Sequence, residues 1–80
     1  MLGQLHLIEV IDAALRLCDV ANPADETGQL QKMFVHDTLL GHREWAFEAG
    51  DDQTVLEQIV GSLERSMLLP FQRWREESTV

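Results

Sequence analysis

The chain has 80 residues, of which 45% are apolar, and its 14 acidic residues against six basic ones give a formal net charge of −8. This length supports one hydrophobic core, and the apolar fraction excludes a disordered acidic tail. The shortage of Lys and Arg argues against direct nucleic-acid binding, which needs a basic patch to replace the phosphate counterions. We therefore expect a single folded domain over residues 1–80.

The first predicted element is an amphipathic helix over residues 4–21. Most of its apolar residues occupy one continuous half of a helical wheel, and most of its polar residues occupy the other half. Adjacent apolar residues, such as Leu7 and Ile8, exclude the alternation of a half-buried strand. The helix is expected to stop before Asn22-Pro23, because proline disfavours helical geometry in the residue that precedes it.

A second helix is expected over residues 23–49. Asn22 can cap it and Pro23 suits its first position, although a start about one turn later is an alternative. The apolar residues of this segment fall on three sides of the wheel. Either neighbouring helices surround one continuous helix, or the helix breaks near Gly41 and its two halves face different ways. We predict a kink or a short break near Gly41.

The clearest turn signal in the chain is Gly50-Asp51-Asp52. Gly50 can end the second helix, while Asp51 or Asp52 caps a third helix, predicted over residues 52–69. The apolar residues of this third helix fall within an arc of roughly 140° on the wheel, which is typical of a helix that buries one face.

Pro70 must end or bend the third helix, because proline lacks the backbone N–H that the helix ladder requires. Phe71 and Trp74 follow with a spacing of three, which indicates a short final helix over residues 70–77. These elements together predict an all-α fold, a small bundle of three to four helices.

No group of residues in the sequence specifies a catalytic, metal or cofactor site. His6 and Glu9 share a helix face, but a zinc site needs at least one more ligand, which His36 or His42 would have to supply through folding. Cys18 lies within the apolar arc of the first helix, where burial makes a thiol unreactive. We therefore expect no enzymatic activity, no cofactor and no bound metal.

The apolar side chains near the end of the chain exceed what one helix face can bury. Residues 67–71 form an unbroken apolar run, and aromatic and methionine side chains are enriched at protein interfaces. Side chains that the core cannot accommodate would form an exposed binding patch. The candidate partner-binding residues are Met67, Leu68, Leu69, Phe71, Trp74 and Trp45.

The expected function is that of a small protein–protein interaction module, acting as an adaptor, an inhibitor or a chaperone-like regulatory protein. It would bind a helical protein partner, or itself as a homo-oligomer, through an apolar face of the first helix or through residues 67–74. One alternative is an acidic decoy that inhibits a nucleic-acid-binding protein, and a second is a metal-binding helical protein. The expected location is the cytoplasm, because the first residues lack a basic signal-peptide start and no apolar segment reaches the length of a membrane span.

Overall fold

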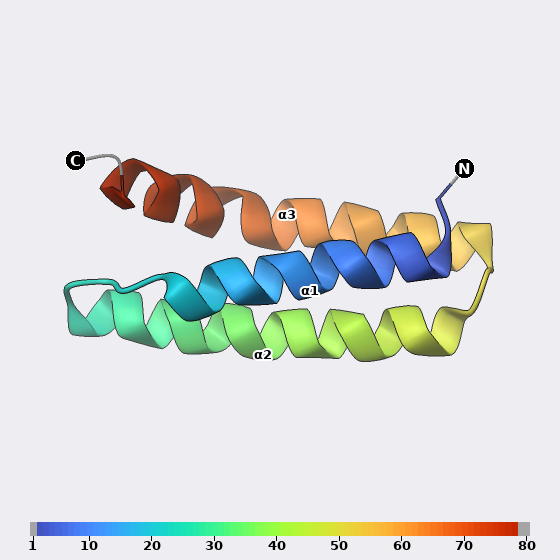
Figure 1. Ribbon diagram of the computed structural model, residues 1–80, viewed down its shortest axis with the longest axis horizontal. Helices are drawn as coiled ribbons and strands as arrows, with labels where there is room; N and C mark the ends of the chain where they lie inside the picture. Colours follow the sequence, from blue (N-terminus) through green and yellow to red (C-terminus); the bar gives the residue numbers. More distant parts are fainter. Residues whose placement is uncertain (1, 79–80) are drawn as a thin grey trace.

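The computed structural model describes the backbone of residues 2–78 and the side chains of residues 2–67 and 69–73. No strand occurs in this part of the chain, and none of its helices is long and apolar enough to cross a membrane. The predicted all-α bundle is therefore confirmed, with an elongated shape of 40 × 21 × 18 Å (Figure 1). The helices are α1 (Gln4–Val20), α2 (Glu26–Ala49) and α3 (Gln53–Ser78).

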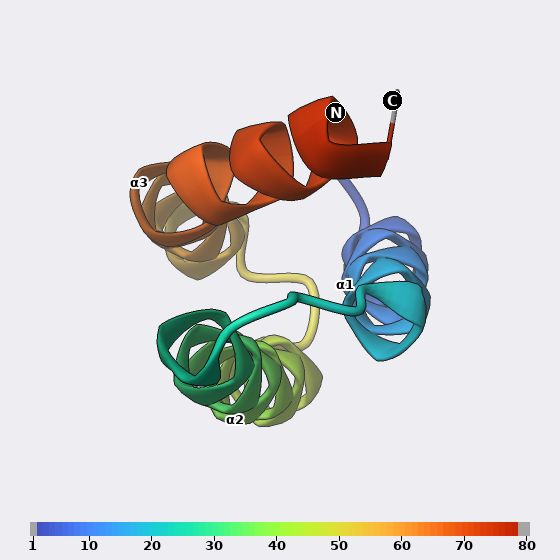
Figure 2. The ribbon, with the colours of Figure 1, turned by 90° about the vertical axis from the view of Figure 1, so that its left-hand side faces the viewer.

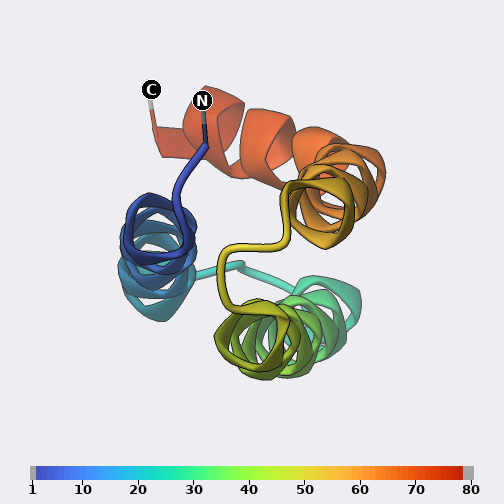
Figure 3. The same ribbon diagram turned by 90° about the vertical axis from the view of Figure 1, so that its right-hand side faces the viewer.

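Helix α2 contacts both of the other helices. Views along the bundle show α1 and α3 on two different sides of α2 (Figures 2 and 3). The packing of α1 on α2 is the most extensive, whereas α1 and α3 touch each other along little of their length. All three helices contribute to one core. Its buried residues are Leu7, Ile11, Cys18, Val35, Leu39, Ala46, Leu56, Ile59 and Met67.

The predicted break near Gly41 is wrong, because α2 runs without interruption from Glu26 to Ala49. Leu39 and Ala46, on either side of Gly41, are both buried in the same core. A glycine inside a helix costs about 1 kcal/mol relative to alanine, whereas one buried leucine contributes about 1.5–3 kcal/mol. Tertiary packing therefore outweighs the local weakness. Of the three apolar sides of α2, the one that carries Val35, Leu39 and Ala46 is buried, whereas the large apolar side chains of the other two sides are exposed, so neighbouring helices do not surround α2.

Helix α2 also begins later than predicted. Asp25 is its N-cap, with the carboxylate Oδ1 accepting a hydrogen bond from the backbone N of Gly28 at 2.7 Å. Pro23 therefore lies before the helix, buried in the turn that follows α1. Its carbonyl accepts a hydrogen bond from Nε2 of Gln29 at 2.7 Å, which ties this turn to the first turns of α2.

The two segments predicted on either side of Pro70 form one helix, α3. Pro70 cannot donate a hydrogen bond to the carbonyl of Ser66, and its ring crowds that carbonyl, so the helix bends. Figures 2 and 3 show the first half of α3 nearly end-on and its orange-to-red second half turning across the bundle toward α1. Phe71, in this second half, packs against the core.

At the C-terminal ends of α1 and α2, backbone carbonyls accept hydrogen bonds from side chains of the other helix. Lys32 of α2 donates hydrogen bonds from Nζ to the carbonyls of Asp19 and Ala21, at 3.2 and 2.8 Å. A cation at the C-terminus of α1 also offsets the negative end of the helix dipole. At the opposite end, Gln4 of α1 donates from Nε2 to two carbonyls in the last turn of α2, at 3.0 and 2.8 Å. These bonds hold α1 and α2 together at both ends.

Candidate functional site

An apolar groove lies between α1 and α3, where these two helices separate. Its volume is about 460 Å³. Among the described residues that line it, only Glu64 and Gln72 are polar. The apolar lining residues are Val10, Ile11 and Ala14 from α1, Leu39 from α2, and Leu63, Met67 and Phe71 from α3.

The groove exists because the apolar arc of α1 is wider than the surface that α2 covers. Ile11 and Leu39 at the groove are completely buried, whereas Val10 is 47% exposed. Leu17 lies seven residues after Val10 on the same face of α1 and is 59% exposed. Water therefore reaches apolar side chains at the edge of the core, and covering them would be favourable by about 25 cal/mol per Å² of apolar area.

The two rims of the groove differ in chemistry. The α1 rim is apolar through Val10 and Leu17. The α3 rim carries exposed Glu64, and exposed Glu57 lies one heptad earlier on the same face of α3, beyond the residues that line the groove. Neither carboxylate has an ion-pair partner among the described side chains, where both ion pairs join α1 to α2. The groove is therefore apolar on one side and negatively charged on the other.

A second apolar surface covers the outer face of α2. Asp37 and Glu44 lie between its apolar side chains and divide them into two narrow rows. This surface is the convex face of a single helix, whereas the groove is bounded by two helices. The large exposed side chains of this face are Leu30, Met33, Phe34, Leu40, Trp45 and Phe47.

Two of the residues predicted to bind a partner lie at the groove. Met67 is buried and Phe71 is half-buried, and both line the groove from α3. The sequence analysis did not single out Val10 or Ala14, which line it from α1. The available signal was the width of the α1 apolar arc, which covers half of the helical wheel and exceeds what one neighbouring helix buries.

The other predicted residues either do not line the groove or have side chains outside the described part of the chain. Leu69 is on the outer surface of α3 and is 73% exposed. Trp45 is on α2, with its ring centre 5.9 Å from that of His42. The side chains of Leu68 and Trp74 lie outside the described residues. Among the described side chains, Leu69 and Trp45 therefore do not join Met67 and Phe71 in the lining of the groove.

A serine–histidine pair joins α2 to α3. Nδ1 of His42 lies 2.7 Å from the carbonyl oxygen of Thr38, and Nε2 lies 2.8 Å from Oγ of Ser62. Because a carbonyl can only accept, Nδ1 carries a hydrogen, and in the neutral ring Nε2 then accepts a hydrogen bond from the serine hydroxyl. Ser62 sits inside α3, where backbone N–H groups are bonded within the helix and cannot stabilise an oxyanion. The pair therefore fixes the packing of α2 against α3.

The histidines and the cysteine are distributed over the bundle. His6 is on α1, whereas His36 and His42 are on α2. In the described part of the chain, no group of three or more His, Cys, Asp or Glu side chains could hold a metal ion. Cys18 is buried, and its Sγ lies 3.5 Å from the carbonyl oxygen of Lys32. Burial raises the pKa of this thiol, and so does the nearby Asp19 carboxylate, while Lys32 opposes the shift.

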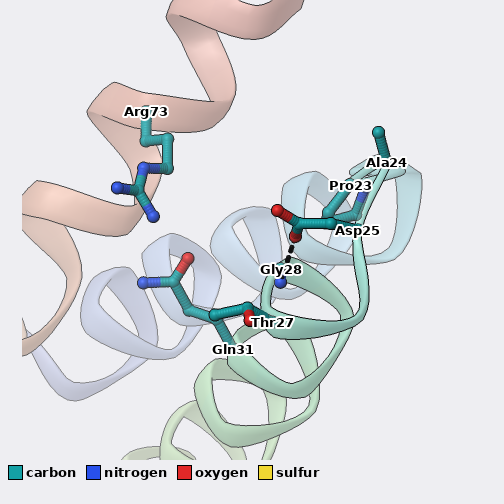
Figure 4. Close-up of a pocket in the computed structure, with 7 residues that line it drawn as sticks. All are labelled: Pro23, Ala24, Asp25, Thr27, Gly28, Gln31 and Arg73. Carbon is teal, nitrogen blue, oxygen red and sulfur yellow. Dashed lines mark hydrogen bonds between the residues drawn. The ribbon is translucent and has the colours of Figure 1, made fainter.

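A polar pocket lies between the start of α2 and the second half of α3 (Figure 4). Arg73 of α3 and Gln31 of α2 face each other across it. Oε1 of Gln31 is buried and has no hydrogen-bond partner among the described residues. The N-terminus of α2 is already capped by the carboxylate of Asp25, as the dashed line in Figure 4 shows. We therefore interpret this pocket as a polar junction between two helices.

No known protein family matches this chain, and no characterised protein or solved structure is significantly similar to it. The functional argument therefore depends on the groove, its apolar lining and its acidic rim.

Proposed function

We propose that the protein is a small non-enzymatic interaction module that receives a helix of a partner protein in the groove between α1 and α3. The observation that carries this proposal is the separation of the two helices, which leaves an apolar groove beside the buried side chains of Ile11 and Leu39. An amphipathic helix in such a groove buries its apolar face against two helices at once. A module of this kind acts as an adaptor, an inhibitor or a chaperone-like regulator of its partner.

The proposed occupant is a different protein and not a second copy of this chain. A symmetric dimer would bring together two chains that each carry a formal net charge of −8. Each copy would also bring to the interface the carboxylates of Glu57 and Glu64, which have no ion-pair partner among the described residues. Like charges across an interface oppose association. The outer face of α2 supports docking less well, because Asp37 and Glu44 interrupt its apolar surface.

The test uses a synthetic amphipathic helix of Leu, Ala and Gln, about 18 residues or five turns long. This probe has an apolar face and carries no side-chain charge. Fluorescence anisotropy of the labelled peptide should show saturable binding with one peptide for each chain. Val10→Glu places a charge on the groove rim and should weaken binding about tenfold or more, because a charge in an apolar contact must be desolvated.

Val20→Glu is the matched control, since it makes the same change at an exposed position of α1 that does not line the groove. Loss of binding in Val10→Glu with retention in Val20→Glu supports the proposal. Absence of binding by the unmodified chain, or equal weakening by the two variants, contradicts it. Sedimentation velocity should show a monomer, and a dimer that Val10→Glu disrupts would identify a second copy as the occupant instead.

A further inference from the structure

We infer that the partner helix is cationic and carries Lys or Arg side chains, one heptad apart, that lie along the α3 rim of the groove. This inference rests on the proposed function, because it specifies the chemistry of the helix that the groove receives. The observations that carry it are the positions of Glu57 and Glu64, their lack of ion-pair partners among the described residues, and the apolar character of the opposite rim.

Glu57 and Glu64 present two carboxylates in a row on the face of α3 that borders the groove at Glu64. They are seven residues apart in α3, which places them on one face and about 10.5 Å apart along the helix axis. Both side chains are exposed, and Glu64 lines the groove itself. Among the described residues, neither forms a hydrogen bond or an ion pair. Cations on a bound helix can therefore pair with them without disrupting any described contact inside the chain.

Two of the basic residues of this chain are used elsewhere. Lys32 binds the carbonyls of Asp19 and Ala21 at the C-terminus of α1. Arg43 binds the carboxylate of Asp12, with Nε 2.7 Å from Oδ1. Both interactions lie at the junction of α1 and α2, and they neutralise charge there. On α3, Arg65 follows Glu64 and lies beside Gly61, but it forms no ion pair among the described residues. Two carboxylates against this one cation leave the α3 rim negative, which favours a positively charged partner.

The contrast between the rims also specifies how a bound helix is rotated about its own axis. Val10 and Leu17 on the α1 rim favour apolar side chains of the partner. Glu57 and Glu64 on the α3 rim favour basic ones. The partner should therefore carry its basic residues along one flank of its apolar face, with the same spacing of seven residues that separates the two carboxylates.

The experiment compares three peptides that share the Leu and Ala positions of the uncharged probe. The first retains Gln at two flank positions seven residues apart, the second has Lys at both, and the third has Glu at both. At low ionic strength, the Lys peptide should bind on the order of tenfold more tightly than the Gln peptide, as expected for two solvent-accessible ion pairs. The Glu peptide should bind more weakly than either. Salt at about 0.3 M should reduce these differences, because it screens exposed charges.

Two double variants of the protein locate the effect. Glu57→Gln with Glu64→Gln should abolish the preference for the Lys peptide over the Gln peptide. Glu44→Gln with Glu48→Gln removes the same charge from exposed positions of α2 and should preserve most of the preference. These four positions are exposed and have no ion-pair partner among the described side chains, so both variants should fold.

The outcomes separate this inference from the proposed function. Equal binding of the Lys and Gln peptides would overturn the cationic partner and leave the groove as a helix-binding site. Equal loss of the preference in the two double variants would attribute it to net charge and would also overturn the inference. Failure of all three peptides to bind would contradict the proposed function itself.

Discussion

Gly41→Ala should stabilise the protein. Gly41 lies inside α2 and is exposed, and a Cβ atom added there would have no heavy atom within 4 Å. A glycine in a helix interior costs about 0.8–1.0 kcal/mol relative to alanine, so the substitution should raise the free energy of unfolding by a similar amount. For a chain of 80 residues, about 1 kcal/mol corresponds to a rise of roughly 4–8 °C in the melting temperature.

The same added methyl group should be unfavourable at two other glycines. Gly50, after α2, has a φ of 59° and a ψ of −133°, a conformation that side-chain-bearing residues rarely adopt. Gly50→Ala should therefore cost about 1–3 kcal/mol. At Gly28, the new Cβ would lie 2.5 Å from Cβ of Pro23 and 2.9 Å from Oδ1 of Asp25. Gly28→Ala should destabilise the protein because the rigid proline ring must move.

Thermal unfolding followed by far-UV circular dichroism measures the three effects under identical conditions. Gly41→Ala should raise the melting temperature, while Gly50→Ala and Gly28→Ala should lower it. A lower melting temperature for Gly41→Ala than for the parent chain would refute the reasoning. It would indicate that α2 breaks at Gly41, as the sequence alone predicts.

Three further predictions concern single side chains. Asp25→Ala removes the cap of α2 and should lower the free energy of unfolding in urea by about 1 kcal/mol. Asp25→Asn keeps a capping oxygen and should lower it less. Equal losses in the two variants would argue against the cap. Gln31→Met removes a buried acceptor that has no partner among the described residues and should stabilise the protein by about 1 kcal/mol. A loss of stability would show that Oε1 has a partner. Because the pKa of Cys18 is raised by burial, the folded state holds the thiol proton more tightly than the unfolded state. The resulting stability is complete below the unfolded pKa of about 8.5 and is lost as the pH rises above it. The free energy of unfolding should therefore fall more steeply with alkaline pH in the parent chain than in Cys18→Ala, and parallel curves would contradict this.

The helices could be predicted where the pattern of a segment agrees with its tertiary surroundings. The one-sided apolar arcs of α1 and α3 predicted two helices that bury one face, and both are present. Gly41 and Pro70 are the exceptions, because each weakens a helix locally but lies within a longer packed element. Leu39 and Ala46 anchor α2 on both sides of Gly41, and Phe71 packs against the core after Pro70. Local propensity therefore indicated breaks that packing prevents.

The sequence indicates both helices as binding surfaces, but it names individual residues of the groove on α3 only. Met67 and Phe71 belong to an apolar run that one helix face cannot bury completely. This run indicated a binding surface near that end of the chain. Val10 and Ala14 belong to an arc that the sequence assigns to the core as a whole. Whether α2 or α3 covers each position of that arc depends on how far the helices separate, which no local pattern encodes.

The central claim is that the groove between α1 and α3 receives a helix, and the most direct test is to locate a bound one. A nitroxide spin label on the uncharged peptide broadens the NMR signals of nuclei close to it. We expect broadening of the methyl signals of Val10, Ala14 and Leu63 at the groove. Broadening centred on Phe34 and Phe47, on the outer face of α2, or no broadening at any position, would contradict the claim.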